Sequence, residues 1–127
     1  MNNRKFIFLM RDFIQSVKAS GINFDGNQAL VGMYGEIECR IEDGTHAGLP
    51  GHLILLVSLS KASLEPVKAL ELNGNFHLML DSYIALINNT GYFLVRSFLI
   101  PEHTNQLHDY LNETVELVRN LMKEKLI

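Results

Sequence analysis

The sequence predicts a single α+β domain, an antiparallel β-sheet with three helices in the order α-β-β-β-α-β-β-α. Apolar residues recur at steps of three and four near both ends of the chain, which is typical of amphipathic helices. Between them lie five short segments with the patterns of β-strands. Short turns join most of these segments, which favours antiparallel pairing. A length of 127 residues, 47% of them hydrophobic, supplies one sizeable core and is too short for two ordinary domains.

The first predicted element is a helix over residues 4–19. Its apolar side chains share one face, and they are Phe6, Leu9, Met10, Phe13, Ile14 and Val17. Ser20-Gly21 is typical of a helix end, so the helix is expected to stop there. Phe8 lies away from the apolar face of this helix.

A turn at residues 25–27, Asp-Gly-Asn, leads into three predicted strands over residues 29–33, 36–42 and 53–59. In the second strand apolar and charged residues alternate, which means that one face is buried and the other is wet. Its inward residues are Ile37, Cys39 and Ile41. A connector rich in Gly and Pro, residues 43–51, separates the second strand from the third.

A short second helix is expected from Ser60 or Ser63, either of which can cap it, to about Leu72. Pro66 is tolerated because it falls in the first turn. The following Asn-Gly pair, residues 73–74, would favour a hairpin between two strands, but its upstream flank is helix-forming. We therefore expect the pair to end the helix, with its glycine in the left-handed conformation. Phe76 is then expected to begin the passage to the fourth strand.

The last two predicted strands, residues 83–88 and 92–100, are joined by Asn-Thr-Gly at 89–91. A final helix begins near Thr104, after Pro101, and runs to the C-terminus. Its apolar stripe consists of Leu107, Tyr110, Leu111, Val115, Val118, Leu121 and Met122.

Composition limits the possible partners and compartment. The net charge is -3, whereas a general nucleic-acid binder needs a basic face, so no nucleic-acid partner is expected. The N-terminal apolar run spans only residues 6–10, whereas a secretory signal needs about 7–15 apolar residues and a membrane helix about 20. One cysteine excludes an internal disulfide and fits a reducing compartment. We therefore expect a cytoplasmic protein with no membrane insertion.

The sequence carries no pattern typical of an enzyme, so we expect no catalytic residue, no metal and no cofactor. The five histidines are scattered, and no pair has the i, i+4 spacing of a helical metal site. Cys39 alternates with inward isoleucines and has no identifiable activating base, so it is interpreted as a small core residue. The glycines at 44, 48 and 51 lack the Gly-Lys-Ser/Thr ending of a phosphate loop.

The distribution of hydrophobic residues points to a partner. Residues 53–59, LILLVSL, and residues 92–100, YFLVRSFLI, are apolar on both faces, whereas a small antiparallel sheet normally leaves one face to water. The helices of the chain can supply the cover, as they do in many small domains. Alternatively, part of this surface is an interface, because large exposed apolar patches usually mark interaction sites. Phe8 favours the second alternative.

The element order, the acidic balance and two segments resemble the class I type III secretion chaperones. The segments are "VKALELNGNF", a short leucine-rich helix that ends in Asn, and "SYIALINNTGYFLVRSFLI", two apolar strands around a polar turn. A long amphipathic helix closes the domain in that family, as residues 104–126 do here. The resemblance spans nearly the whole chain and is one of pattern, because none of its residues is diagnostic in the way of a catalytic motif.

The resemblance implies a homodimer in the bacterial cytoplasm without enzymatic activity. Such a chaperone binds an extended segment near the N-terminus of a secreted effector protein, adds it to its sheet, and keeps it soluble and competent for export. The implied dimer residues are Leu64, Val67, Leu70, Leu72, Tyr92, Leu94 and Phe98. The implied effector-binding residues are Phe6, Phe8, Leu9, Phe13, Val31 and Met33.

Two other hypotheses remain open. The chain is alternatively a small-molecule-binding or enzymatic α+β domain with a pocket between sheet and helices. That hypothesis requires a cavity with convergent polar groups such as His77, Asp81 or Tyr83. The third hypothesis is a structural subunit of a larger assembly, which only its partner would identify.

Overall fold

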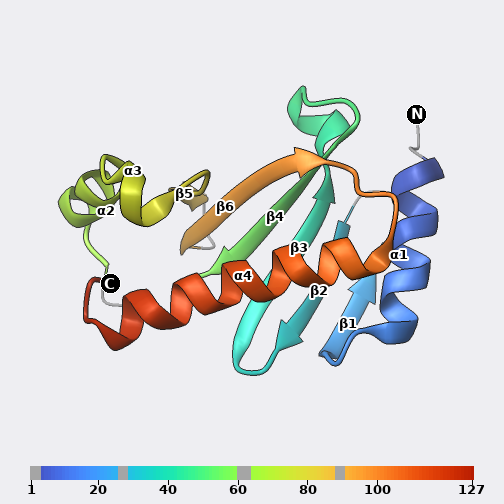
Figure 1. The fold of residues 1–127 in the computed structure, drawn as a ribbon, viewed down its shortest axis with the longest axis horizontal. Helices are drawn as coiled ribbons and strands as arrows, with labels where there is room; N and C mark the ends of the chain where they lie inside the picture. The colour runs from blue at the N-terminus through green and yellow to red at the C-terminus, as the bar shows by residue number, and fades with distance from the viewer. Residues whose placement is uncertain (1–3, 26–28, 60–63, 88–90) are drawn as a thin grey trace.

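The computed structural model describes residues 4–25, 29–59, 64–87 and 91–127. It is an α+β fold built on a six-stranded antiparallel sheet with the strand order β1-β2-β3-β4-β6-β5 (Figure 1). The helices are α1 (Arg4–Ser16), η1 (Gly44–Ala47, a 3-10 helix), α2 (Pro66–Asn73), α3 (Phe76–Met79) and α4 (Thr104–Lys123). The strands are β1 (Ser20–Phe24), β2 (Ala29–Tyr34), β3 (Ile37–Asp43), β4 (His52–Ser58), β5 (Tyr83–Ile87) and β6 (Gly91–Leu99). The predicted fold class is confirmed.

Helices α1 and α4 cover one face of the sheet, and α4 runs across its strands (Figure 1). Both helices bury the apolar stripe that their sequences predict. The fully buried side chains of this core include Phe6, Met10, Phe13, Leu53, Leu55, Val57, Leu94, Leu107, Val115 and Val118. Each such side chain stabilises the fold by roughly 1.5–3 kcal/mol relative to an exposed position, so this layer is the main source of stability.

The opposite face of the sheet carries a second, smaller apolar cluster. Leu56, Phe93 and Val95 are buried there, with Ile54 and Ala85 packed against them. Strand β4 therefore sends Leu53, Leu55 and Val57 to the helix-covered face and Ile54 and Leu56 to the other. The prediction that the β4 and β6 segments are apolar on both faces is confirmed.

Strand β1 was not predicted, and the first helix is shorter than expected. Helix α1 ends at Ser16, and Ser20-Gly21 begins a strand rather than only stopping the helix. The new strand pairs with β2 through an irregular register between Ser20 and Asn23, where Gly21 adopts a φ of 60°. The ring of Phe24 lies 6.5 Å from that of Phe6, so tertiary packing fixes this segment. The predicted turn at residues 25–27 falls partly outside the described residues.

The region between β4 and β5 also differs from expectation. Helix α2 begins at Pro66 with Glu65 as its cap residue, whereas Ser60 and Ser63 lie outside the described residues. The helix ends at Asn73 as predicted, but Gly74 has a φ of −80°, so the left-handed ending was wrong. The chain does not go straight to β5, because the Asn75 side chain accepts a hydrogen bond from the Leu78 backbone N–H (3.1 Å) and begins α3.

The remaining boundaries agree closely with the predicted ones. The connector at 43–51 contains η1, which Asp43 caps by accepting from the Thr45 backbone N–H (3.1 Å). Helix α4 begins at Thr104 as predicted, and the Gln106 side chain accepts from the His103 backbone N–H (3.2 Å). The predicted turn at 89–91 lies mostly outside the described residues. The described part of the chain thus has four α-helices where three were predicted.

Candidate association surface

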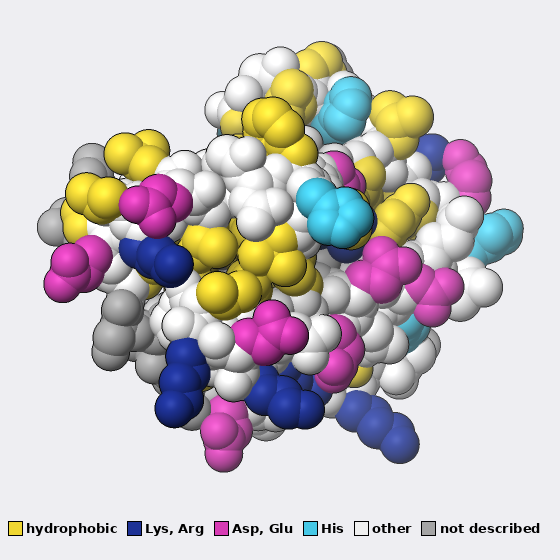
Figure 2. Space-filling view, turned by 60° about the vertical axis from the view of Figure 1, so that its left-hand side comes forward, with side chains coloured by type: hydrophobic (Ala, Val, Ile, Leu, Met, Phe, Trp, Pro, Cys, Tyr) yellow, Lys and Arg dark blue, Asp and Glu magenta, His cyan; other side chains and the backbone are white. Residues whose placement is uncertain are grey.

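Exposed hydrophobic side chains are concentrated at one end of the molecule. Of the ten large ones that are exposed among the described residues, seven lie between residues 67 and 87, in α2, α3, β5 and the turn before β5. They are Val67, Leu70, Phe76, Leu80, Tyr83, Leu86 and Ile87. We refer to these seven residues as the α2–β5 surface. Figure 2, which brings this end forward, shows hydrophobic side chains gathered over it. Figure 1 places it at the opposite end from α1.

Helix α2 shows how the surface arises from sequence. Its Ala69 and Leu72 are buried in the core, which turns Val67 and Leu70 toward solvent, one helical turn apart. A helix that only covers a core normally presents polar residues on its outer side. The outer side of α2 is instead apolar at its centre, and that is typical of a contact with another molecule.

Leu80 is the most constrained residue of the surface. It has a φ of 56° and a ψ of −121°, a backbone conformation that a bulky side chain rarely adopts, and its side chain is 72% exposed. Such a conformation costs on the order of 1–3 kcal/mol and persists only where the surroundings enforce it. The fold therefore holds an apolar side chain in solvent against both its hydrophobicity and its backbone preference.

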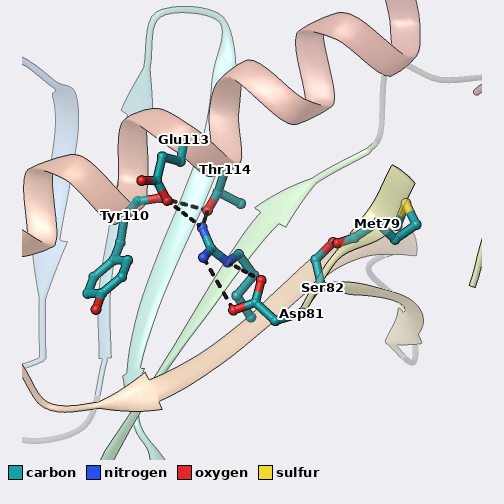
Figure 3. Close-up of polar contacts among 7 residues, drawn as sticks. Met79, Asp81, Ser82, Tyr110, Glu113 and Thr114 are labelled. Carbon is teal, nitrogen blue, oxygen red and sulfur yellow. Dashed lines mark hydrogen bonds and ion pairs between the residues drawn. The ribbon is translucent and has the colours of Figure 1, made fainter. Parts of the chain in front are cut away.

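Arg96 of β6 holds the residue after Leu80, Asp81, in place. Figure 3 shows Asp81 near Glu113 and Thr114 of α4. The Arg96 Nε and Nη2 donate to the two carboxylate oxygens of Asp81 at 3.1 and 3.3 Å, a bidentate pair. Its Nη1 donates to Thr114 Oγ1 at 3.0 Å and lies 3.4 Å from Glu113 Oε2. Arg96 thereby ties the turn before β5 to α4, and its side chain is only 13% exposed.

Aromatic rings complete this cluster. Phe98 and Tyr110 stack with their centroids 4.0 Å apart, and the Arg96 guanidinium carbon lies 5.8 and 5.7 Å from the two centroids. The Thr114 hydroxyl also donates to the Tyr110 carbonyl at 2.7 Å. Ser82 donates from its hydroxyl to the Met79 carbonyl, so the ends of the same turn are hydrogen-bonded. The turn that presents Leu80 is thus held by side chains from β6 and α4 and by its own Ser82.

The predicted dimer residues separate into three groups. Val67 and Leu70 are exposed and belong to the α2–β5 surface. Leu64, Tyr92 and Phe98 are half-buried and pack against the core. Leu72 and Leu94 lie inside the core of a single chain. The prediction missed the other five residues of the surface, although the i, i+4 spacing of Phe76 and Leu80 was visible.

The predicted effector-binding residues are similarly divided. Phe6, Leu9 and Phe13 are core residues of α1, because they lie on the side of the helix that faces the sheet. Phe8 is exposed on the outer side of α1. Val31 and Met33 are half-buried on the sheet face opposite α1 and α4, as their pairing with Arg40 and Glu38 shows. The structure does not bring these six residues together.

A hollow of about 330 Å³ adjoins Phe8 between α1 and the start of α4. Its lining mixes apolar and charged side chains, including Leu9, Pro101, Asp12 and Lys5. The Lys5 ammonium pairs with Glu102 at 2.6 Å on its rim, and this pairing lowers the pKa of the Glu102 carboxyl. The elements that line the hollow, α1 and the start of α4, lie at the end of the molecule away from α2 and β5 (Figure 1).

The residues that the sequence offered for chemistry do not converge on one cavity, and they are Cys39, His77, Asp81 and Tyr83. Burial raises the pKa of the Cys39 thiol to about 12, so the nucleophilic thiolate is disfavoured at neutral pH. Asp81 is bound to Arg96, while His77 and Tyr83 are exposed. A cavity beside Cys39 measures only about 30 Å³, the scale of a single water, and is lined almost entirely by apolar residues.

Residues 4–25, 29–59, 64–87 and 91–127 contain neither a cluster of metal ligands nor a membrane-spanning helix. Among those residues, no three His, Cys, Asp or Glu side chains are grouped so that they could hold a metal ion. None of the helices there combines the length and the apolar character needed to cross a membrane.

No protein-family model, no curated protein and no solved structure matches this chain. Function is therefore inferred from the geometry of the chain itself. The feature of that geometry that its own folding does not explain is the α2–β5 surface. Large apolar side chains stand in solvent there, and one of them is held in a strained backbone conformation. The structure thus identifies a candidate protein–protein association surface.

Proposed function

We propose that the chain is an export chaperone that acts as a homodimer and binds an extended N-terminal segment of a secreted effector protein. The observation that carries the proposal is the α2–β5 surface, because exposed apolar side chains at this density usually mark an interface. The resemblance of the sequence to the class I type III secretion chaperones supplies the biological setting. In this proposal the protein performs no chemistry, and its activity is binding.

The size of the surface fits a partner that is itself a folded protein. Burying one large apolar side chain contributes roughly 1.5–3 kcal/mol. At about 25 cal/mol per Å², this corresponds to about 60–120 Å² of apolar surface removed from water. The seven residues of the α2–β5 surface therefore offer several hundred Å² of apolar surface. A standard protein–protein interface buries ~800 Å² on each partner. The surface is close to that scale before any polar rim is included.

Charge on α2 favours a second copy as this partner. Lys68 and Glu71 lie on the same flank of the Val67–Leu70 centre, at i and i+3. When two copies of a helix pack antiparallel about a two-fold axis, like flanks face each other. Each Lys68 then lies toward the Glu71 of the other copy, so the same surface is complementary to itself.

The effector segment is assigned to the other end of the molecule. Phe8 and the adjoining hollow offer an exposed aromatic ring beside mixed apolar and charged walls. Such a groove suits the alternating side chains of an extended peptide. Because α1 lies far from the α2–β5 surface in Figure 1, a dimer leaves both of its grooves open.

Co-purification from the source cell, followed by reconstitution, tests this proposal. Mass spectrometry identifies the captured protein, and its N-terminal segment is then mixed with the purified chain. We expect two segments to bind per dimer, one at each groove, and Phe8→Ser to weaken binding about tenfold while the dimer persists. Substitution of Leu49, an exposed leucine outside both surfaces, by serine is the control and should leave binding unchanged. A captured protein whose N-terminal segment does not bind would contradict the proposal.

A further inference from the structure

Strand β5 is at the end of the sheet, so one of its edges has no neighbouring strand. Residues in an antiparallel strand alternate between facing the neighbour and facing away. The backbone N–H and C=O of Ile84 both bond to the Asn73 side chain, outside the sheet. The backbone groups of Tyr83, Ala85 and Ile87 therefore face β6. An unpaired edge of this kind is a template for another strand.

The carboxamide of Asn73 occupies this edge. Its Nδ2 donates to the Ile84 carbonyl oxygen at 3.0 Å, and its Oδ1 accepts from the Ile84 backbone N–H at 2.7 Å. A neighbouring strand would make the same two bonds, so one side chain takes the place of a strand residue. The other outward residues are Ser82, whose N–H donates to the Met79 carbonyl at 3.0 Å, and Leu86.

As a consequence, the outer edge of β5 has too few free backbone N–H and C=O groups to pair with another strand. A strand ladder uses outward residues at every second position, here Ser82, Ile84 and Leu86. Among the described residues of this edge, both backbone groups of Ile84 and the Ser82 N–H have partners, which leaves the outward groups of Leu86 and the Ser82 carbonyl for a strand. The segment is otherwise well suited to pairing, because it is apolar and its sequence, YIALI, carries no charge.

We propose that Asn73 determines how this protein associates, because it closes the β5 edge and restricts the α2–β5 surface to side-chain contact with a second copy. The inference rests on the proposed function for the identity of the partner. Without Asn73, two β5 edges could pair across the two-fold axis into a continuous sheet, and chains could assemble beyond the dimer. With it, the contact is made by Val67, Leu70 and the other side chains of the surface. Asn73 is therefore a positioning residue, placed at the last position of α2 to reach the strand.

The matched test compares Asn73→Ala with Asn75→Ala in the full chain. Asn75 lies two residues away and caps α3, so its substitution removes a side-chain bond in the same segment but leaves the β5 edge closed. Light scattering measures mass over a range of concentrations, and hydrogen exchange measures protection of the Ile84 amide. We expect Asn73→Ala to raise Ile84 exchange about tenfold and to form species larger than the dimer. Asn75→Ala should retain both the protection and the dimer mass.

The double variant Leu70→Asp, Asn73→Ala separates this inference from the proposed function. Leu70→Asp removes association through side chains, whereas edge pairing needs only backbone groups, so the double variant should still self-associate. A monomeric wild-type chain would contradict the homodimer of the proposed function. Faster Ile84 exchange and new self-association in Asn73→Ala would still support closure of the β5 edge by Asn73. Wild-type exchange and wild-type mass in Asn73→Ala would overturn the inference.

Discussion

At the scale of single residues, two side chains are held where their own chemistry disfavours them. Leu80 combines solvent exposure with a φ of 56°, and Cys39 carries a titratable thiol in a core position. The first is consistent with the proposed contact with a partner, because exposure of an apolar side chain does not stabilise a single chain. The second is a consequence of folding, because a strand that alternates inward and outward must fill its inward positions with small or apolar side chains.

Leu80→Gly should stabilise the single chain and weaken its association. Glycine adopts this backbone conformation freely, whereas Leu80→Ala removes the same side chain but keeps the strain. We expect the glycine variant to exceed the alanine variant in free energy of unfolding by about 1–2 kcal/mol. Urea denaturation in a Leu70→Asp background measures this difference without a contribution from dimerisation. An alanine variant as stable as the glycine variant would contradict the strain assigned to Leu80.

Cys39 predicts loss of stability in alkaline solution. Because burial raises the pKa of the folded thiol from 9.0 to about 12, the folded state holds its proton at pH values where the unfolded state has released it. The contribution of the protonated Cys39 thiol to the free energy of unfolding is therefore complete below pH 9. It falls as pH rises from 9 toward 12, by at most about 1.4 kcal/mol per pH unit. Between pH 8 and pH 10.5, the free energy of unfolding measured by urea denaturation should decrease more for wild type than for Cys39→Ala. Equal decreases would contradict the prediction.

At the scale of elements, the Arg96 cluster joins β6, α4 and the turn before β5. Arg96→Met keeps a long apolar stem but removes the bidentate pair with Asp81 and the bond to Thr114. Both carboxylate partners are more than half exposed, so solvent screens the ion pairs and most of the loss comes from the Thr114 bond and the aromatic packing. We expect a decrease of about 1–2 kcal/mol in the free energy of unfolding.

The control for this variant is Arg119→Met. Arg119 pairs with Glu116 at 3.2 Å on the exposed side of α4, one helical turn away. Such exposed pairs contribute about 0.5 kcal/mol or less. Thermal or urea denaturation compares the two variants directly, and similar losses would show that Arg96 is an ordinary surface residue.

The elements that the sequence predicted correctly are those whose pattern is long enough to read. Helix α4 repeats its apolar stripe over five turns, and β3 alternates over its full length, so both could be identified from the chain alone. Strand β1 and helix α3 have only five and four residues, too few for periodicity, and are set by pairing with β2 and by the Asn75 cap. Their positions depend on tertiary contacts.

The candidate surface was predictable only in part, for a similar reason. The sequence shows leucines at 70 and 72 but not which of them faces the core, because a helix of eight residues allows more than one rotation. The bonds from Asn73 to Ile84 span eleven residues and a turn, so no local pattern contains them. Phe76, Leu80 and Leu86 could be placed on a surface only once α3 and β5 were known.

At the scale of the whole molecule, the two ends have different roles in this account. We propose that the α2–β5 end associates with a second copy and that the α1 end binds the effector segment. The helix-covered sheet lies between these two ends (Figure 1). Opposite placement allows both contacts at once, because neither surface shares residues with the other. The central claim is that the first of these surfaces makes a dimer.

The mass of the purified chain in solution tests that claim most directly. Light scattering at micromolar concentration should give twice the 14.4 kDa of one chain. Leu70→Asp should halve that mass, whereas Leu99→Asp, the same substitution at a side chain that is 69% rather than 72% exposed but lies outside the surface, should leave it unchanged. A wild-type mass of 14.4 kDa, or equal effects of the two substitutions, would contradict the account.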